Sequence, residues 1–392
     1  MSLTPAHLSA SETRPHTAGA GGRSAPPSLR FVLLTAALAY MTCLAVVTGS
    51  ANFWELMAQR FDNPKYLACA DAVRQLRPAA VLDNREKFLG LPVLIAAVGS
   101  ALRISSATAM IAVSVLAGFA GVALCWRMYG PWVAVAFSVV SFSWISLLVL
   151  GGGAEALFMA LLLGALLAAR RQRFEWAGLL AGLAVTVRPH GVFVVAAVVI
   201  ASAARRYRDA VRPALAASVV VGTYVVVQHL FSSSLLAHWQ GYSTDWYGRW
   251  PVTLPLLPVI SGLMTDTGSP ATVAYRAAWI VAVSAAVVAI LARRSYGVLL
   301  AHRAEAWYAA MATVFLFSYN SSVAAEQFPR FAILVLPFLL AALEDWLPKD
   351  RRVWVAAAAV SGVLTGLSLV GVAQFGARLP AHLLVRVLDV CD

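Results

Sequence analysis

The chain has 392 residues, of which 60% are hydrophobic and 12% are charged, and its mean hydropathy is +0.77. This composition excludes a water-soluble globular protein and predicts an all-α, polytopic transmembrane helical bundle. The formal net charge of +12 does not indicate a nucleic acid partner, because Lys and Arg lie between apolar runs, as they do in the basic loops of a membrane protein.

The amino-terminal region predicts the orientation of the chain. Residues 1–30 are rich in Ser, Thr, Pro, Gly and Arg, which is typical of a disordered tail. Residues 31–48 form an apolar run long enough to cross a bilayer, and the arginines before it favour a cytoplasmic amino terminus. A cleaved signal peptide is the alternative, although the run is longer than a usual signal sequence.

Residues 49–103 predict a first outer loop with interfacial helices. The loop contains an amphipathic helix after Asp62 and a short apolar stretch, Phe88 to Leu102. The 15 residues of this stretch favour an interfacial or re-entrant helix, with a spanning helix as the alternative.

The rest of the transmembrane module, residues 31–375, brings the expected total to about eleven spans. Residues 174–204 carry Arg188, Pro189 and His190 in their middle, so we expect two short helices that meet near the outer face. With residues 88–102 left outside the membrane, every cluster of adjacent bases is cytoplasmic. The remaining spans are 104–125, 131–150, a fourth that ends at Arg170, 214–231, 272–292, 305–319, 328–346 and 353–375, followed by a tail at 376–392.

Several ionisable residues gather on the expected outer side. Asp62 precedes a helix, so it is a candidate acid for proton transfer or, alternatively, the N-cap of that helix. Charges at membrane depth are costly and usually functional, which makes Glu155 and Arg188 candidates as well. The structural alternatives are a helix-dipole role for Glu155 and an ion pair between these two residues.

An aromatic and polar segment, residues 237–251, also falls on the outer side. Trp and Tyr are typical of a membrane interface, but aromatic faces and polar side chains also suit a sugar. The substrate-binding candidates are Tyr66, His238, Trp239, Gln240, Tyr242, Asp245, Trp246, Arg249, Tyr319 and Asn320.

The order of these motifs resembles the GT-C superfamily of membrane glycosyltransferases, in particular the GPI-type and protein O-mannosyltransferases that use polyprenyl-phosphate sugars. The resemblance runs from Asp62 to about Pro337. Its motifs are Asp62 with Tyr66 and Ala70, Gly90-Leu91-Pro92, Glu155, the run AGLLAGLAVTVRP that contains Arg188, and Arg330 followed by Pro337. The large carboxy-terminal domain of some branches is absent, and no second acid adjoins Asp62, which leaves a requirement for a divalent metal open.

The resemblance implies an inverting transfer of one sugar, mannose or a related one, from a polyprenyl-phosphate donor at the extracytoplasmic face. The acceptor is the hydroxyl of a glycan, lipid or protein, and the membrane is that of the cell envelope, as in the bacterial inner membrane. Asp62 is the expected base, with Glu155 as the second catalytic candidate. Arg188, Arg330 and His190 are the candidates for binding the donor phosphate.

Two other functions remain open. A secondary transporter or lipid-linked-sugar flippase would use the broken helix pair at residues 174–204 as its substrate site. A polysaccharide polymerase or ligase would also use arginines on the outer face, but it would have a long late outer loop, whereas residues 319–328 are short.

Overall fold

Helices make up the regular structure of the chain, as the sequence predicts. The structure is a computed structural model that describes residues 27–59, 62–77, 88–151, 154–232, 252–265, 270–293, 297, 303–319 and 324–377. Within these residues no strand forms, and the β-contact is an isolated antiparallel bridge between Val252 and Tyr319. The all-α prediction is therefore confirmed for the described part of the chain.

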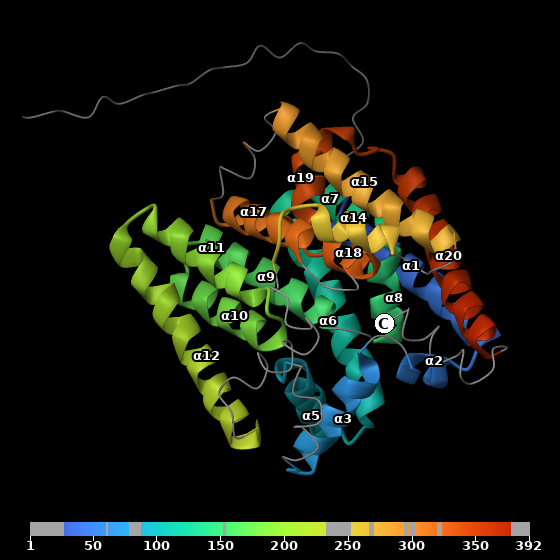
Figure 1. Cartoon of the computed structure of the whole chain (residues 1–392), viewed down its shortest axis with the longest axis horizontal. Helices are drawn as coiled ribbons and strands as arrows, with labels where there is room; N and C mark the ends of the chain where they lie inside the picture. The colour runs from blue at the N-terminus through green and yellow to red at the C-terminus, as the bar shows by residue number, and fades with distance from the viewer. Residues whose placement is uncertain are drawn as a thin grey trace, which may run out of the picture.

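The helices follow one another along the chain as Figure 1 shows. They are α1 (Leu29–Ser50), α2 (Phe53–Gln59), α3 (Asn63–Arg74), α5 (Gly90–Leu102), α6 (Ser106–Tyr129), α7 (Pro131–Val140), α8 (Phe142–Leu150), α9 (Glu155–Arg170), α10 (Phe174–Val187), α11 (Gly191–Ala203), α12 (Val211–Ser232), α14 (Leu257–Met264), α15 (Pro270–Arg293), α17 (Arg303–Ser318), α18 (Ala324–Ala332), α19 (Leu336–Ala342) and α20 (Arg351–Ala377). Two short 3₁₀ helices, Tyr207–Ala210 and Glu344–Trp346, precede α12 and follow α19.

Several of these helices indicate a multi-pass membrane protein. In the described residues, five apolar stretches are long enough to cross a bilayer, in α1, α6, α15, α20 and the continuous run Tyr207–Leu230. Counting two bent helix pairs as one span each raises the total to seven. The larger number of about eleven spans remains a prediction, because it also needs the shorter helices α9, α10, α11 and α17 to cross.

Two expected straight spans are broken. In place of one helix over residues 131–150, α7 and α8 meet at 73°, and α18 and α19 replace the second at 59°. At the first break, the Ser141 hydroxyl accepts a hydrogen bond from the Trp144 amide at 3.1 Å and caps α8. At the second, Pro337 lies in the first turn of α19, a position that favours proline because its missing amide hydrogen is not needed there.

The expected split of residues 174–204 is present as α10 and α11. Arg188 ends α10 in an extended conformation, with φ of −151° and ψ of 149°. The following Pro189 disfavours the helical region for Arg188, which explains why the helix stops at this residue.

The first and the last of the described helices pack together through glycines. Helices α1 and α20 lie side by side (Figure 1), and a Cβ atom on Gly362 would lie 2.5 Å from the Ala39 carbonyl oxygen. Gly366, four residues later, faces Val46 and Cys43 of α1 in the same way. This small-xxx-small spacing allows two helix backbones to approach closely inside a membrane.

Gly362→Ala should destabilise the protein by about 1–3 kcal/mol, because the added methyl group has no room against α1. Thermal unfolding of the purified protein in detergent measures the effect. Gly371→Ala in the same helix is the matched control, because a Cβ atom added there would have no other atom within 4 Å. Equal unfolding temperatures for the two variants would contradict the tight α1–α20 contact.

Candidate functional site

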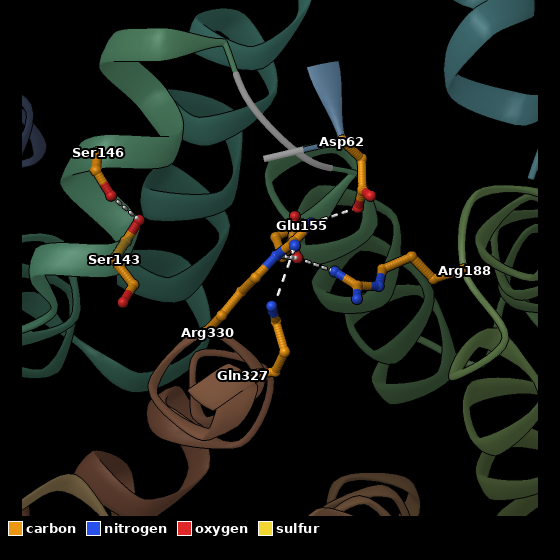
Figure 2. A network of polar contacts seen from close by, with 7 residues as sticks. All are labelled: Asp62, Ser143, Ser146, Glu155, Arg188, Gln327 and Arg330. Carbon is orange, nitrogen blue, oxygen red and sulfur yellow. Dashed lines mark hydrogen bonds and ion pairs between the residues drawn. The ribbon is translucent and has the colours of Figure 1, made fainter. Parts of the chain in front are cut away.

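Four charged side chains from distant parts of the chain meet at one place (Figure 2). Asp62 precedes α3, Glu155 begins α9, Arg188 follows α10, and Arg330 lies in α18. All four are candidates predicted from the sequence, and the structure brings them together.

Glu155 is the centre of this cluster. Its side chain is fully buried, and its Oε1 atom forms ion pairs with Nη1 of Arg188 and Nε of Arg330. The second oxygen, Oε2, is buried without a hydrogen-bond partner among the described residues. Glu155 is also the first residue of α9, so the positive end of the helix dipole adds to the neutralisation by the two guanidinium groups.

Asp62 lies at the open edge of the cluster. Its side chain is 27% exposed, compared with 11% for Arg330, and its Oδ2 atom lies 3.2 Å from Nη2 of Arg330. Although Asp62 occupies the N-cap position of α3, its side chain makes no capping hydrogen bond. Asp62 is therefore at the N-cap position, as the alternative expects, but its carboxylate makes an ion pair with Arg330 and no capping bond.

The neighbouring Asn63 explains why Asp62 is held at this place. The Asn63 side chain is buried, and its Nδ2 atom donates to the carbonyl oxygens of Met57 at 2.7 Å and Leu150 at 3.2 Å. Leu150 ends α8 shortly before Glu155, so one amide group joins the start of α3 to the chain that leads into α9.

Arg330 is oriented by other polar groups of α18. The side chain of Gln327 accepts a hydrogen bond from Arg330 Nη1 at 3.4 Å. Glu326, one residue earlier, lies 3.7 Å from Arg276 of α15, and this pair ties the two helices together. Sequence reasoning missed Arg276, although a cation inside an expected apolar span is itself a signal of a buried partner.

Arg188 is held from two sides. Its guanidinium carbon lies 5.2 Å from the centroid of the Phe331 ring, an arrangement that favours a cation. On the other side, the start of α5 packs against the last turn of α10. A Cβ atom on Gly90 of α5 would lie 2.6 Å from the carbonyl oxygen of Thr186 in α10. Glycine at the start of α5 therefore permits this contact two residues before Arg188.

His190, a candidate for binding the donor phosphate, is buried among aromatic rings. The residue is 6% exposed, and the centroids of the Phe315 and Phe331 rings lie 5.0 and 5.6 Å from that of its imidazole. Phe158 and Phe193 also contact the ring edge-on. The Phe331 ring contacts both His190 and Arg188, so it connects His190 to the charged cluster.

Two of the expected substrate-binding tyrosines lie beside these groups. Tyr66 of α3 is buried, and burial, with the nearby charge of Asp62, raises the pKa of its phenol well above the usual range. Its hydroxyl is therefore neutral and able to donate a hydrogen bond. Tyr319 lies 5.8 Å from Phe331 between ring centroids. The other candidates, His238, Trp239, Gln240, Tyr242, Asp245, Trp246, Arg249 and Asn320, lie outside the described residues.

The charges of the four side chains indicate how well this cluster would suit a divalent metal ion. Two carboxylates face two guanidinium groups, so the four side chains have no net charge. A divalent cation bound by Asp62 and Glu155 would lie against two fixed positive charges, which makes this donor set a poor match for a metal. Among the described residues, no group of three or more His, Cys, Asp or Glu side chains could hold a metal ion.

No family model, no characterised protein and no solved structure matches the chain.

Glu155→Gln should destabilise the protein by about 3–5 kcal/mol, because two buried guanidinium groups would lose their shared carboxylate. Arg188→Gln is the matched comparison and should cost less, since Arg330 would still neutralise Glu155. Thermal unfolding in detergent compares the two. A Glu155→Gln protein as stable as the wild type would show that the cluster does not hold these helices together.

Proposed function

We propose that this chain is a membrane glycosyltransferase of the GT-C kind, which moves one sugar from a polyprenyl-phosphate donor to an acceptor hydroxyl. The observation that carries the proposal is the convergence of an open carboxylate, Asp62, with two arginines that a buried carboxylate holds in place. An inverting transfer from a phosphate needs these two functions, a base for the acceptor and positive charge for the leaving group.

In the proposed reaction, Asp62 is the base. The acceptor hydroxyl oxygen forms a bond to the anomeric carbon of the sugar while its proton passes to the Asp62 carboxylate. The bond between that carbon and the phosphate oxygen breaks, and its electron pair leaves with the polyprenyl phosphate. Asp62 suits this role because it is the most exposed of the four charged side chains and makes no helix-capping bond.

Arg188 and Arg330 are the proposed partners of the donor phosphate. Guanidinium groups bind phosphate through charge-assisted hydrogen bonds, which are strong in a site shielded from water. In the structure Arg330 also pairs with Asp62, and such a pair weakens a carboxylate as a base. A bound phosphate would compete for Arg330, so donor binding and activation of Asp62 are coupled in this proposal.

Glu155 acts in this proposal as a positioning residue. Its Oε1 atom contacts both arginines and its side chain is fully buried, so it can fix their orientation without reaching the sugar. His190 supports the same groups through the Phe331 ring. The substrate-binding roles of Tyr66, Tyr319 and the aromatic segment 237–251 belong to the same proposal.

The proposed setting is the extracytoplasmic face of a multi-pass membrane protein of the cell envelope, such as the bacterial inner membrane, with a cytoplasmic amino terminus. Arg170, at the far end of α9 from Glu155, and the basic stretch 205–212 support this sidedness, because basic loops favour the cytoplasm. The sugar is mannose or a related one, and the acceptor is a glycan, lipid or protein hydroxyl.

A secondary transporter or flippase is the second candidate function. The observation that favours it is the bending of α7 with α8 and of α18 with α19, since broken helices often line transport sites. The two proposals differ in chemistry, because a flippase would move a lipid-linked sugar without cleaving it. Release of free polyprenyl phosphate from the donor would therefore favour the transferase.

Asp62→Asn should lower turnover by about 10²–10⁴-fold with a polyprenyl-phosphate sugar, because the amide cannot accept the proton. The Asn side chain keeps the size of Asp, so the variant should fold and bind the donor lipid. Sugar transfer by the purified protein in detergent, together with donor binding, measures both properties.

Asp71→Asn is the matched control for this experiment. Asp71 lies in α3, the helix that Asp62 precedes, and its Oδ1 atom accepts a hydrogen bond from Ser106, which an amide oxygen can also accept. This control should retain wild-type turnover. An Asp62→Asn variant with full activity would exclude Asp62 as the base.

The sidedness can be tested with reporters. Fusions that end after Arg173 and after Arg208 should both report from the cytoplasm, since α10 and α11 form a pair of helices between them. A fusion after Ser232, at the end of α12, should report from the opposite side. Opposite signals at Arg173 and Arg208 would contradict the assignment of α10 and α11 as two spans.

A further inference from the structure

A second charged site lies at the other end of α9. Glu155 is the first residue of this helix and Arg170 is the last, so the two are about 22 Å apart along the axis. Arg170 forms an ion pair with the buried Glu305 of α17 and donates a hydrogen bond to the Met128 carbonyl oxygen at 2.9 Å. Its guanidinium carbon also lies 5.0 Å from the centroid of the Tyr129 ring. The site is thus built from the ends of several helices.

A pocket opens beside this ion pair, between the carboxy-terminal ends of α9 and α11 and the start of α17. Its lining combines small apolar groups with cations and a hydroxyl. The residues that line it are Ala169, Arg170, Phe174, Ala201, Ser202, Arg205, Arg303, Ala304 and Glu305.

The pocket has an excess of positive charge. Arg170 and Glu305 neutralise each other, which leaves the cations of Arg205 and Arg303. Arg303 donates a hydrogen bond to the Ala204 carbonyl oxygen at 3.2 Å. This acceptor is neutral and does not offset the positive charge of the guanidinium group. Among the described residues Arg205 has no ion pair or hydrogen bond from its side chain. The two guanidinium groups therefore lie at the pocket without an acidic partner of their own in the part of the chain that the structure describes.

Basic side chains at the end of a membrane helix usually orient the protein and lie in water, and Arg206 and Arg208 fit this description because both are exposed. Arg205 and Arg303 are exposed as well, but they also line the pocket, whose other walls include alanines and Phe174. A site with cations on one side and apolar groups on the other suits a molecule with a phosphate and a hydrocarbon portion. In a membrane protein, a phospholipid is the kind of molecule that combines these two groups.

We propose that this pocket binds the phosphate headgroup of an anionic phospholipid, with Arg205 and Arg303 as its principal ligands. The lipid would join α11 to α17, which already pack against each other and against α9. Because α9 carries Glu155 at its other end, an occupied pocket would stabilise the helices that hold the charged cluster. The proposal does not depend on the glycosyltransferase activity.

The test uses the full-length protein purified in detergent and native mass spectrometry with added phosphatidylglycerol or phosphatidylcholine. The wild type should retain phosphatidylglycerol in preference to the zwitterionic lipid. The double variant Arg205→Gln with Arg303→Gln should lose at least about tenfold in affinity for phosphatidylglycerol, since each basic residue near a membrane surface adds to the attraction. The control double variant, Arg206→Gln with Arg208→Gln, removes the same charge outside the pocket and should bind as the wild type does.

Two results would overturn the proposal. Equal loss of phosphatidylglycerol binding in both double variants would show that the overall charge of this face, and not the pocket, attracts the lipid. The second result comes from competition with inorganic phosphate. If it displaces phosphatidylglycerol completely from the wild type at millimolar concentration, the pocket takes a free anion and the lipid assignment is wrong. Persistence of the bound lipid in excess phosphate would support the proposal.

Discussion

The negative charge of Glu155, buried at the start of α9, is the constraint on which the arrangement of the described helices depends. A carboxylate that is taken out of water without partners is costly, so cations from other parts of the chain must meet it. Arg188 and Arg330 supply these cations from α10 and α18, and Arg330 connects them to Asp62 before α3. These three ion pairs connect four segments of the chain (Figure 2).

Differences in burial among the four side chains distinguish a residue that positions the arginines from one that can meet a substrate. Glu155 is fully buried and contacts both arginines, so it is suited to hold them. Asp62 is more exposed and reaches the cluster through a contact with Arg330 at 3.2 Å, so a bound phosphate can compete with it for this arginine. A structural ion-pair network explains Glu155 and Arg188 well, and this structural role agrees with the proposed catalytic role, because two fixed arginines are what a departing phosphate requires.

Local signals in the sequence predicted much of the fold, whereas contacts between distant residues were not available from them. Pro189 predicts the break between α10 and α11, because proline restricts the residue before it. The bend at Ser141 has no such signal, since serine is also common inside apolar helices. The rarity of charges in apolar spans identified Glu155 and Arg188 individually, and the family resemblance added Arg330. Their common meeting point with Asp62, which is 268 residues away from Arg330, depends on the packing of the bundle.

A structure of the protein bound to a polyprenyl-phosphate lipid tests the account most directly. We expect the lipid phosphate within hydrogen-bonding distance of Arg188 or Arg330, with the Asp62 carboxylate released from Arg330 and facing the place of the sugar. The pairing of Glu155 with both arginines should be retained. A phosphate bound away from these arginines, with the contact between Asp62 and Arg330 unchanged, would contradict the proposed transferase site.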